Sequence, residues 1–416
     1  MFYKEAVDYI ENLEKFGSTY GLDTVRILLD RLNNPQNSLK FVHIAGTNGK
    51  GSTSCFITNI LVKSGYRVGT FNSPSVFGYN ERYLLNNLPI DDVSVAKYIS
   101  QVAGVRDEMI KDGLNVPTAF EVEFAVAMLF FKDSKCDFAV LECGLGGRLD
   151  ATNSIPHKEV AIITSISFDH TAILGNTLQA IASEKAAIVK DCPLVTYKQC
   201  DEVMSVFNKV DDLRVCPSAK LISSSKSGQT FEYKGEKYSI RQLGEYQLQN
   251  CSLAIECAKV LASKGYKISD EDVKVGVESA LWKGRLQIVN KGGKTFLLDG
   301  AHNPDGAKVL AQELKRNFSN VKKCFVFGMF ADKDIDGVLE NIGSLADKFI
   351  AIKPTSKRGL DEKITLEKCL KYTPCSISCS TMGEAIRRAY QSENDTIIVC
   401  GSLSILNSAL EEINKL

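Results

Sequence analysis

The sequence lacks an excess of charge of either sign, because 50 Lys and Arg residues balance 50 Asp and Glu residues. Proteins that bind nucleic acid or an anionic membrane surface through their general charge carry a basic excess. We therefore expect neither nucleic acid nor a membrane among the partners. Any phosphate group that this protein binds must be held by a local site.

Long hydrophobic runs are also lacking. The best uncharged apolar stretch, residues 124–131, is much shorter than the roughly 20 residues that cross a bilayer. Residues 1–16 place apolar side chains at helical spacing with acidic side chains between them, which predicts a surface helix. They do not follow the basic, then apolar, then small-residue order of a secretory signal peptide. We therefore expect a cytoplasmic protein.

Cysteine motifs are missing although cysteine itself is not scarce. The 13 Cys residues are scattered without a CxxC pair, and the closest two, Cys375 and Cys379, have no histidine nearby. A zinc site or a disulfide framework needs more regular spacing. We expect reduced cysteines that act as small hydrophobic residues.

The most informative segment that is present is FVHIAGTNGKGST at residues 41–53. It predicts a buried strand, a glycine-rich turn and the start of a helix. Backbone N–H groups in such a turn, the helix dipole and the Lys50 ammonium together favour a bound phosphate. The general GxxxxGK[ST] pattern would need glycine at position 44 and a hydroxyl at position 51, where this chain has Ile44 and Gly51. On these residues alone, a chance glycine-rich turn stays an alternative.

Short β-branched segments alternate with helical segments, which favours a parallel sheet covered on both faces. With 416 residues the chain is too long for one core, so two or three domains are expected. Residues 223–240 interrupt the alternation and predict a small antiparallel insertion. The alternation restarts after the sequence NKGGK, which predicts a turn or linker and a second α/β domain from about residue 290. The expected strands are 40–45, 67–71, 138–143, 160–165, 194–197, 295–298, 324–327, 348–352 and 396–400, and the expected helices include 121–131 and 178–189.

Three further segments place polar side chains just after expected strands, where ligands bind in open α/β sheets. A carboxylate before a glycine loop suits a magnesium ligand beside a phosphate site. Each segment also has a plain structural interpretation, as a turn, a helix cap, a hydrogen-bonding histidine or a solvated lysine. The candidate residues are Glu142, Asp169 with His170, Lys185, Asp299 and His302.

Eight motifs in order resemble the Mur ligase superfamily and, within it, the folylpolyglutamate synthase and dihydrofolate synthase family. The resemblance runs from about Gly17 to Leu406. This family has Lys-Gly-Ser in its phosphate loop, which accounts for Gly51. The motifs are GTNGKGS at 46–52, NSP at 72–74 with NER at 80–82, PTAFE at 117–121, ECGLGGRLDATN at 142–153, SFDHTAILGNTLQAIASEKAAIVK at 167–190, QLQN at 247–250, GRL at 284–286 and LDGAHNP at 298–304.

The resemblance implies an α/β fold with two domains. Residues 1–289 would form an ATP-binding, Mur-ligase-like domain with a P-loop-type, mostly parallel sheet and the small antiparallel insertion. Residues 290–416 would form a smaller, Rossmann-like ligase domain. Closure of the second domain on the first is expected to complete the site and to keep water from an activated intermediate.

The activity that the resemblance implies is ATP-dependent amide ligation. ATP would phosphorylate a carboxylate to an acyl phosphate, and the amino group of L-glutamate would attack it, giving an amide, ADP and phosphate. The acceptor would be a reduced folate, dihydropteroate or both. We expect these small molecules as the partners and a monomer as the functional state.

The same resemblance assigns roles to individual residues of this chain. The nucleotide-binding residues would be Asn48, Gly49, Lys50, Gly51, Ser52, Asn250, Arg285, Asp299 and His302. Two magnesium ions would be ligated by Ser73, Glu142, His170 and Lys185, the last as a carbamate formed with CO2. Lys50, His170 and Lys185 would be the catalytic residues. The pterin-bearing substrate would lie against Gly21, Leu22, Asp23, Phe120, Glu121 and Asp150.

One departure concerns the loop after the second strand, where the family commonly has Ser-Pro-His-Leu and this chain has Ser-Pro-Ser-Val at residues 73–76. Ser73 is retained, so the departure bears on substrate preference and not on metal binding. Two other functions stay open at this point. One is a Mur-type ligase that uses a nucleotide-linked peptidoglycan precursor, and the other is a non-catalytic ATP-binding module.

Overall fold

A computed structural model describes residues 1–14 and 21–416 of the chain. The start of the family resemblance, Gly17, and the last two residues of the predicted N-terminal helix lie outside the described residues. Two compact units are present. Unit 1 comprises Met1–Ala219, Tyr233–Tyr238 and Gln249–Ala280, and unit 2 comprises Lys220–Glu232, Ser239–Leu248 and Leu281–Leu416.

Unit 1 is built on an eight-stranded sheet with the strand order β4-β3-β2-β5-β1-β6-β7-β8. Strands β2, β5, β1, β6, β7 and β8 run parallel, and β3 and β4 add an antiparallel edge. The strands are β1 (Lys40–Ala45), β2 (Val68–Phe71), β3 (Tyr83–Leu85), β4 (Leu88–Pro89), β5 (Phe138–Glu142), β6 (Val160–Ile163), β7 (Leu194–Tyr197) and β8 (Leu213–Cys216).

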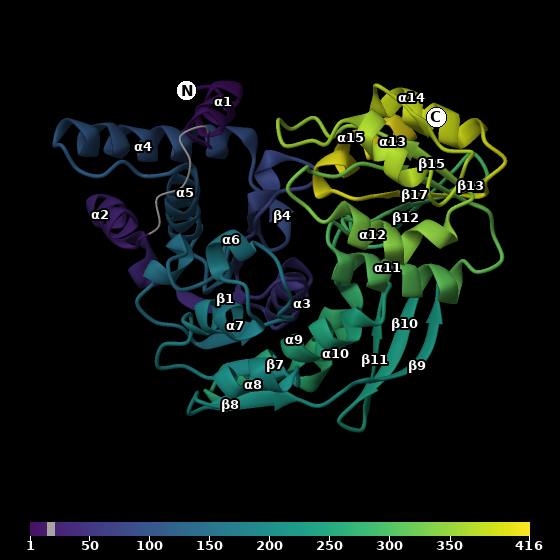
Figure 1. The fold of residues 1–416 in the computed structure, drawn as a ribbon. Coiled ribbons are helices and arrows are strands. Elements are labelled where there is room, and N and C mark those ends of the chain that lie inside the picture. The colour runs from purple at the N-terminus through teal and green to yellow at the C-terminus, as the bar shows by residue number, and fades with distance from the viewer. Residues whose placement is uncertain (15–20) are drawn as a thin grey trace. The chain divides into compact units, whose positions relative to one another are not determined.

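The helices of unit 1 cover both faces of this sheet (Figure 1). The α-helices are α1 (Tyr3–Glu14), α2 (Asp23–Arg31), α3 (Lys50–Lys63), α4 (Asp92–Lys111), α5 (Ala119–Asp133), α6 (Thr171–Leu174), α7 (Leu178–Ala186), α8 (Asp201–Phe207), α10 (Asp270–Ser279) and most of α9 (Tyr246–Ser263). The short 3-10 helices are η1 (Pro35–Ser38), η2 (Tyr79–Arg82) and η3 (Ala151–Ser154).

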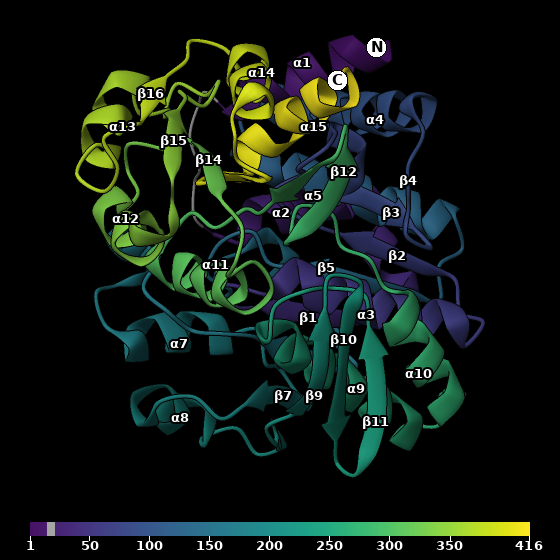
Figure 2. The ribbon, with the colours of Figure 1, turned by 90° about the vertical axis from the view of Figure 1, so that its right-hand side faces the viewer.

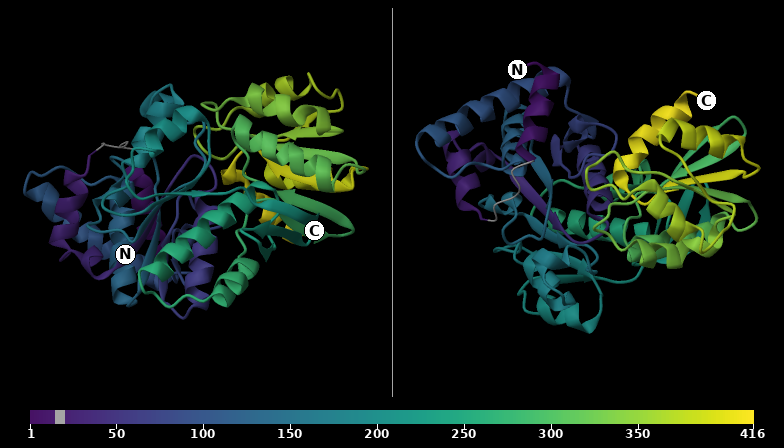
Figure 3. Two further views of the ribbon diagram at one scale, coloured as in Figure 1. Left: turned by 90° about the horizontal axis from the view of Figure 1, so that it is seen from below. Right: turned by 45° about the horizontal axis from the view of Figure 1, so that its top comes forward.

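Helix α5 shows how the sequence specifies one side of unit 1. Its sequence AFEVEFAVAMLFF is apolar almost all round, and nearly every side chain from Ala119 to Phe131 is buried. The helix begins with a capping box, in which Thr118 and Glu121 each accept from the other's backbone N–H. Helices α1, α2, α4 and α5 share one core, and both views of Figure 3 show the purple and blue helices gathered together.

Helix α3 lies on the opposite face of the sheet from α5 and contacts β1, β2 and β5. Residues alternate between the two faces along each strand, so the position of α3 decides which strand residues it covers. Phe41, Phe71 and Leu141 belong to the core under α5. The residues next to them in sequence therefore face α3.

A separate three-stranded antiparallel sheet has the order β11-β10-β9, and Figure 2 shows its strands side by side. The strands are β9 (Lys220–Ser225), β10 (Gly228–Tyr233) and β11 (Glu236–Ile240). The predicted antiparallel insertion at 223–240 is therefore confirmed, with a start three residues earlier.

Unit 2 contains a six-stranded sheet with the order β12-β13-β17-β14-β15-β16, in which only the edge strand β12 is antiparallel. The strands are β12 (Gln287–Lys291), β13 (Lys294–Leu298), β14 (Lys323–Phe327), β15 (Lys348–Ala351), β16 (Ile377–Ser378) and β17 (Thr396–Cys400). The helices are α11 (Pro304–Asn317), α12 (Ile335–Ile342), η4 (Gly343–Leu345), α13 (Glu362–Cys369), α14 (Met382–Gln391), η5 (Leu403–Ile405) and α15 (Leu406–Asn414).

The expected fold class is confirmed: a mostly parallel α/β sheet, a small antiparallel sheet and a C-terminal α/β sheet are all present. Every expected strand is found, with ends that differ by no more than two residues. The NKGGK segment is the turn of the β12–β13 hairpin and not a linker. The predicted domain boundary between residues 289 and 290 falls inside β12, and that boundary stays a prediction.

All 13 cysteines lie in the described part of the chain, and all are free, as expected. Eleven of them are buried, which fits their predicted use as small hydrophobic residues. None of the helices in residues 1–14 and 21–416 is both long and apolar enough to cross a membrane.

Candidate functional site

The glycine-rich segment forms the strand, turn and helix that the sequence predicts. Strand β1 ends at Ala45, the turn follows, and α3 begins at Lys50. Gly49 caps the helix with φ of 91°, a left-handed conformation that favours glycine. A Cβ atom at Gly49 would also collide with the carboxamide of Asn250, so this predicted nucleotide residue on α9 lies directly against the turn.

The turn is tied to the segment that follows β6. The Thr47 hydroxyl donates to the Ser167 carbonyl at 3.1 Å, and the Ser167 N–H donates back to the Thr47 hydroxyl at 3.1 Å. The Asn48 N–H donates to the Ser165 hydroxyl at 3.2 Å. Asn48 is a predicted nucleotide-binding residue, whereas Thr47, Ser165 and Ser167 are not predicted site residues, although Thr47 and Ser167 belong to two quoted motifs. Their bonds hold the backbone N–H groups of the turn in a fixed arrangement.

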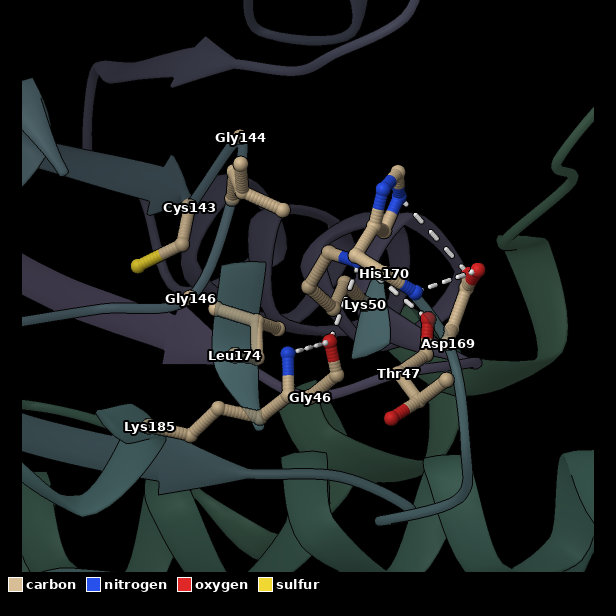
Figure 4. Close-up of a pocket in the computed structure, with 11 residues that line it drawn as sticks. Gly46, Thr47, Lys50, Cys143, Gly144, Gly146, Asp169, His170, Leu174 and Lys185 are labelled. Atoms are coloured by element: carbon tan, nitrogen blue, oxygen red, sulfur yellow. Dashed lines mark hydrogen bonds and ion pairs between the residues drawn. The ribbon is translucent and has the colours of Figure 1, made fainter. Parts of the chain in front are cut away.

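Two lysines meet at this turn. The Lys50 ammonium donates to the carbonyls of Gly46 at 3.2 Å and Thr47 at 3.3 Å, and the Lys185 ammonium, from α7, donates to the same Gly46 carbonyl at 2.9 Å (Figure 4). Lys185 is only 5% exposed. Burial, and then the nearby Lys50 charge, lower the pKa of Lys185 to about 8.

Glu142 ends β5 directly beside Ile44 of β1, as the parallel register requires. Its carboxylate is 6% exposed and lies 3.8 Å from the Lys50 ammonium. A buried carboxylate opposite a buried ammonium is stabilised by that partner. Glu142 therefore lies beside the phosphate turn, at the position that the sequence predicts.

Asp169 and His170 follow β6, and His170 precedes α6 with φ of 50°. The His170 side chain is 44% exposed, and its Nε2 lies 3.8 Å from the Asp169 carboxylate. The His170 N–H donates to the other oxygen of that carboxylate at 3.0 Å. A carboxylate this close holds the imidazole in place and leaves one side of the ring open to a ligand.

Lys50, Lys185, Asp169 and His170 line one polar pocket with a volume of about 40 Å³, whereas Glu142 and Asn250 are not among its lining residues. Figure 4 shows the two lysines directed at Gly46 and His170 across from them. The pocket unites segments that lie far apart in the sequence. Lys50, His170 and Lys185 are the lining residues that the resemblance assigned to the site, and Asp169 was a candidate beside His170. The lining residues are Gly46, Thr47, Lys50, Cys143, Gly144, Leu145, Gly146, Asp169, His170, Leu174 and Lys185.

The remaining metal candidate, Ser73, follows β2 and does not line this pocket. Its hydroxyl is buried and has no hydrogen-bond partner in the described part of the chain. The described residues contain no group of three or more His, Cys, Asp or Glu side chains that suits a metal ion. The predicted donors fit magnesium in another way, because a hydroxyl, a carboxylate and phosphate oxygens are the hard ligands it prefers.

Two predicted substrate residues have full structural roles. Glu121 accepts from the N–H of Thr118 at 2.8 Å and from its hydroxyl at 2.9 Å, as part of the capping box of α5. Asp150 is 6% exposed and accepts from the N–H groups of Leu145 at 2.8 Å and Thr152 at 3.0 Å. Both carboxylates shape their local loops through these bonds.

The other predicted substrate residues are Phe120 and the segment at Gly21–Asp23. The Phe120 ring packs on Phe71, with 5.6 Å between ring centroids, and lies against Gly144 of the pocket. Leu22 and Asp23 begin α2, where Asp23 pairs with Arg26 at 3.5 Å on the surface. Phe120 is therefore next to the pocket, whereas Asp23 is solvated.

Unit 2 holds three predicted nucleotide residues around the end of β13. The Asp299 carboxylate is 6% exposed and accepts from the N–H groups of Leu286 and Ala301, each at 2.9 Å. Burial raises the pKa of Asp299, and the Arg285 charge opposes that rise. A Cβ atom on Gly300 would collide with the Arg285 guanidinium, and His302 Nδ1 contacts the Gly300 carbonyl at 2.9 Å. The three candidates are thus neighbours within unit 2.

The histidine in β1 is not part of the pocket. His43 is fully buried, and its Nε2 lies 2.8 Å from the Thr152 hydroxyl and 3.1 Å from the Cys143 sulfur. Burial lowers the pKa of His43 well below its usual value, so the ring is neutral. His43 is a structural hydrogen-bonding residue between β1 and η3.

Residues 208–211, Asn-Lys-Val-Asp, have the NKxD spacing of guanine-recognition motifs. They lie between α8 and β8, at the amino end of a strand that runs parallel to β7. The phosphate turn follows the carboxyl end of β1, and β1, β6, β7 and β8 are all parallel. This segment therefore lies at the amino ends of the parallel strands, opposite the phosphate turn, and does not belong to the pocket.

Comparison with protein families finds two matches along the chain. Residues 44–258 match the Mur ligase middle domain, and residues 284–403 match the Mur ligase glutamate ligase domain. The first match contains the phosphate turn, Glu142, His170 and Lys185. The second contains Arg285, Asp299 and His302.

Individual relatives match over most of their length. The dihydrofolate synthase/folylpolyglutamate synthase of Bacillus subtilis is 35% identical over 360 residues, which cover 83% of each chain. A structure of Escherichia coli FolC in complex with DHPP and ADP has a TM-score of 0.85 and 27% identity, and the match covers 100% of this chain and 98% of that one. A structure of the bifunctional folylpolyglutamate synthase/dihydrofolate synthase of Yersinia pestis with AMPPNP and Mn ion has a TM-score of 0.83 and 27% identity, with 100% and 98% coverage.

Proposed function

This chain belongs to the folylpolyglutamate synthase/dihydrofolate synthase family, and from that premise we propose that it adds L-glutamate to a folate, to dihydropteroate or to both. The γ-phosphoryl group of ATP passes to the substrate carboxylate and gives an acyl phosphate. The amine nitrogen of glutamate then bonds to the acyl carbon, the C–O bond to phosphate breaks, and the amine loses a proton. The products are an amide, ADP and phosphate.

The observation that carries this proposal is the convergence of Lys50 and Lys185 on one backbone carbonyl. Two ammonium groups that share the Gly46 carbonyl repel each other, and the pocket around them is small and mostly closed. An anion beside the turn relieves this repulsion. Because Lys50 also starts α3, the helix dipole adds to the attraction for a nucleotide's phosphates. The pocket is therefore suited to phosphate groups of ATP.

Magnesium is the implied metal, and the residues present fit it. We propose that Ser73, Glu142 and His170 hold it, and the unpartnered Ser73 hydroxyl supports this assignment. When bound, the metal supplies positive charge that neutralises the phosphate and carboxylate oxygens. In its absence Lys50 balances the Glu142 charge, and we propose that Lys50 turns to the nucleotide when ATP enters.

The second metal ligand set includes Lys185 as a carbamate. Formation of a carbamate joins the lysine nitrogen to the carbon of CO2 and releases one proton, which turns a cation into an oxygen ligand. Only the neutral amine reacts. The lowered pKa of Lys185, about 8, supports the proposal because much of the amine is neutral near that pH. The buried position next to Gly46 also keeps the group out of bulk water.

Substrate and nucleotide contacts complete the proposal. Phe120, which packs beside Gly144 of the pocket, is the residue best placed to stack on a flat pterin ring. Glu121 and Asp150 act by shaping the loops around it. In unit 2, Arg285, Asp299 and His302 form a compact group that we propose to contact the nucleotide, and Asp299→Asn is expected to raise the KM for ATP.

The test is phosphate release from ATP at fixed glutamate and magnesium, measured separately with dihydropteroate and with folate monoglutamate. Glutamate-dependent release with either acceptor supports the proposal, and the pair of rates identifies the substrate. Release with a muropeptide acceptor instead identifies a Mur-type ligase. ATP binding without acceptor-dependent release under any of these conditions identifies a non-catalytic module and contradicts the proposal.

A further inference from the structure

A polar stripe runs along the side of α3 that faces the sheet. Lys50, Ser54 and Thr58 are spaced four residues apart, so they lie on one side of the helix. The direction of this side is fixed by Thr58, whose buried hydroxyl lies 2.7 Å from the hydroxyl of Thr70 on β2. Ser54, one turn nearer the start of α3, therefore also faces β2.

The matching positions on the sheet follow from strand geometry. Thr70 and Asn72 are two residues apart, so both side chains point towards α3. The parallel register pairs Phe71 with Leu141, which places Asn72 beside Glu142 at the ends of β2 and β5. Glu142 in turn lies 3.8 Å from Lys50. Asn72 thus lies on the α3 side of the sheet, beside the carboxylate proposed to hold magnesium.

The polar groups at this point lack partners. Asn72 is 2% exposed, and neither its amide oxygen nor its amide nitrogen has a hydrogen-bond partner in residues 1–14 and 21–416. The same holds for the hydroxyls of Ser54, which is fully buried, and of Ser73, which follows Asn72 in the chain. Leaving one such group unsatisfied costs about 1–3 kcal/mol. Three neighbouring groups of this kind indicate a bound ligand.

We propose that Asn72 is a further ligand-binding residue of the magnesium site, with Ser54 as the positioning residue behind it. The amide oxygen of Asn72 contributes to the coordination sphere of the ion held by Ser73 and Glu142, directly or through one water. With the ion bound, the Ser54 hydroxyl would turn to the amide and fix its orientation. An amide oxygen is a hard, neutral ligand that suits magnesium. This inference rests on the proposed function and extends its metal site.

The variant that separates this role from a packing role is Asn72→Leu, which keeps the branched heavy-atom shape and removes both polar atoms. Unsatisfied groups stabilise nothing, so the metal-free protein is expected to keep or raise its melting temperature. The Mn2+ affinity in the presence of ADP, measured by electron paramagnetic resonance of free Mn2+, is expected to fall by roughly 10- to 100-fold. Ser54→Ala is expected to weaken Mn2+ binding by a smaller factor.

The matched control is Thr70→Val, which removes the β2 hydroxyl that is hydrogen-bonded to Thr58 of the polar stripe. It is expected to lower the melting temperature and to leave Mn2+ affinity unchanged. If Asn72→Leu does not fold, Asn72→Asp replaces it and is expected to bind Mn2+ at least as tightly as the natural protein. The inference is overturned if the Mn2+ affinity of Asn72→Leu stays within about twofold of the natural protein's affinity. It is also overturned if Asn72→Asp binds Mn2+ more weakly than the natural protein. Absence of Mn2+ binding in the natural protein with ADP contradicts the proposed function instead.

Discussion

Lys50 and Lys185 show how single residues set the chemistry of the pocket. The two ammonium groups share the Gly46 carbonyl, at 3.2 Å and 2.9 Å, and the Glu142 carboxylate lies 3.8 Å from Lys50. Burial and this repulsion lower the pKa of Lys185 to about 8. Lys185 is buried and loses its proton more easily than a surface lysine, so it is a good candidate for reaction with CO2.

Lys185→Ala is expected to reduce glutamate-dependent phosphate release by roughly 100-fold or more, since it removes a proposed oxygen ligand of the metal. Bicarbonate is expected to restore activity to CO2-depleted natural protein and not to the variant. Glu184→Ala, which removes only a surface ion pair with Arg148 at 2.9 Å, is the control and is expected to keep near-normal activity. Near-normal turnover of Lys185→Ala would rule out the carbamate.

At the scale of elements, a buried lysine joins three segments behind the pocket. Lys158, just before β6, donates to the Asn153 carboxamide in η3 at 2.7 Å and to the Ile188 carbonyl after α7 at 2.6 Å. Lys190 donates to the Asn153 carbonyl at 3.1 Å. These bonds fix the end of α7, and with it the position of Lys185 relative to the phosphate turn.

Lys158 makes stability depend on pH. Burial, and then the nearby Lys190 charge, lower the pKa of Lys158 to about 8, below its unfolded value of roughly 10.5. Between these two values the unfolded chain binds more protons, so the free energy of unfolding rises with pH. The free energy of unfolding of the natural protein minus that of Lys158→Met is expected to increase by about 2 kcal/mol from pH 7.5 to pH 9.5. Urea unfolding at both pH values measures it, and a constant or shrinking difference would contradict the assignment.

At the scale of the whole molecule, the balanced charge and the distribution of exposed apolar side chains both favour a monomer. Large exposed hydrophobic residues are spread along the sequence from Met1 to Tyr372. Scattered residues of this kind are normal on the surface of a monomeric protein.

Sedimentation equilibrium is therefore expected to give one species near the chain mass of 45.7 kDa, with and without ATP and magnesium. The measurement extends over a wide range of protein concentration, because a weak dimer forms by mass action. A mass near twice this value, or one that rises steadily with concentration, would show that the monomer assignment is wrong.

The sequence by itself determined the parts of this protein that depend on neighbouring residues. The β1–turn–α3 unit, the carboxylate at the end of β5, the histidine after β6 and the alternation of strands and helices all follow from local periodicity, turn chemistry and quoted motifs. Such features need no knowledge of the partner segment. The expected strands and the fold class were predictable for this reason.

Only the tertiary structure decided which distant groups meet. The strand order places β1 between β5 and β6, and this arrangement brings Lys50, Glu142 and Lys185 to one point. The buried Asn72 side chain beside Glu142, without a hydrogen-bond partner among the described residues, depends on packing and on register between segments. Register and packing are set by contacts across the whole core, and a local sequence pattern does not encode them.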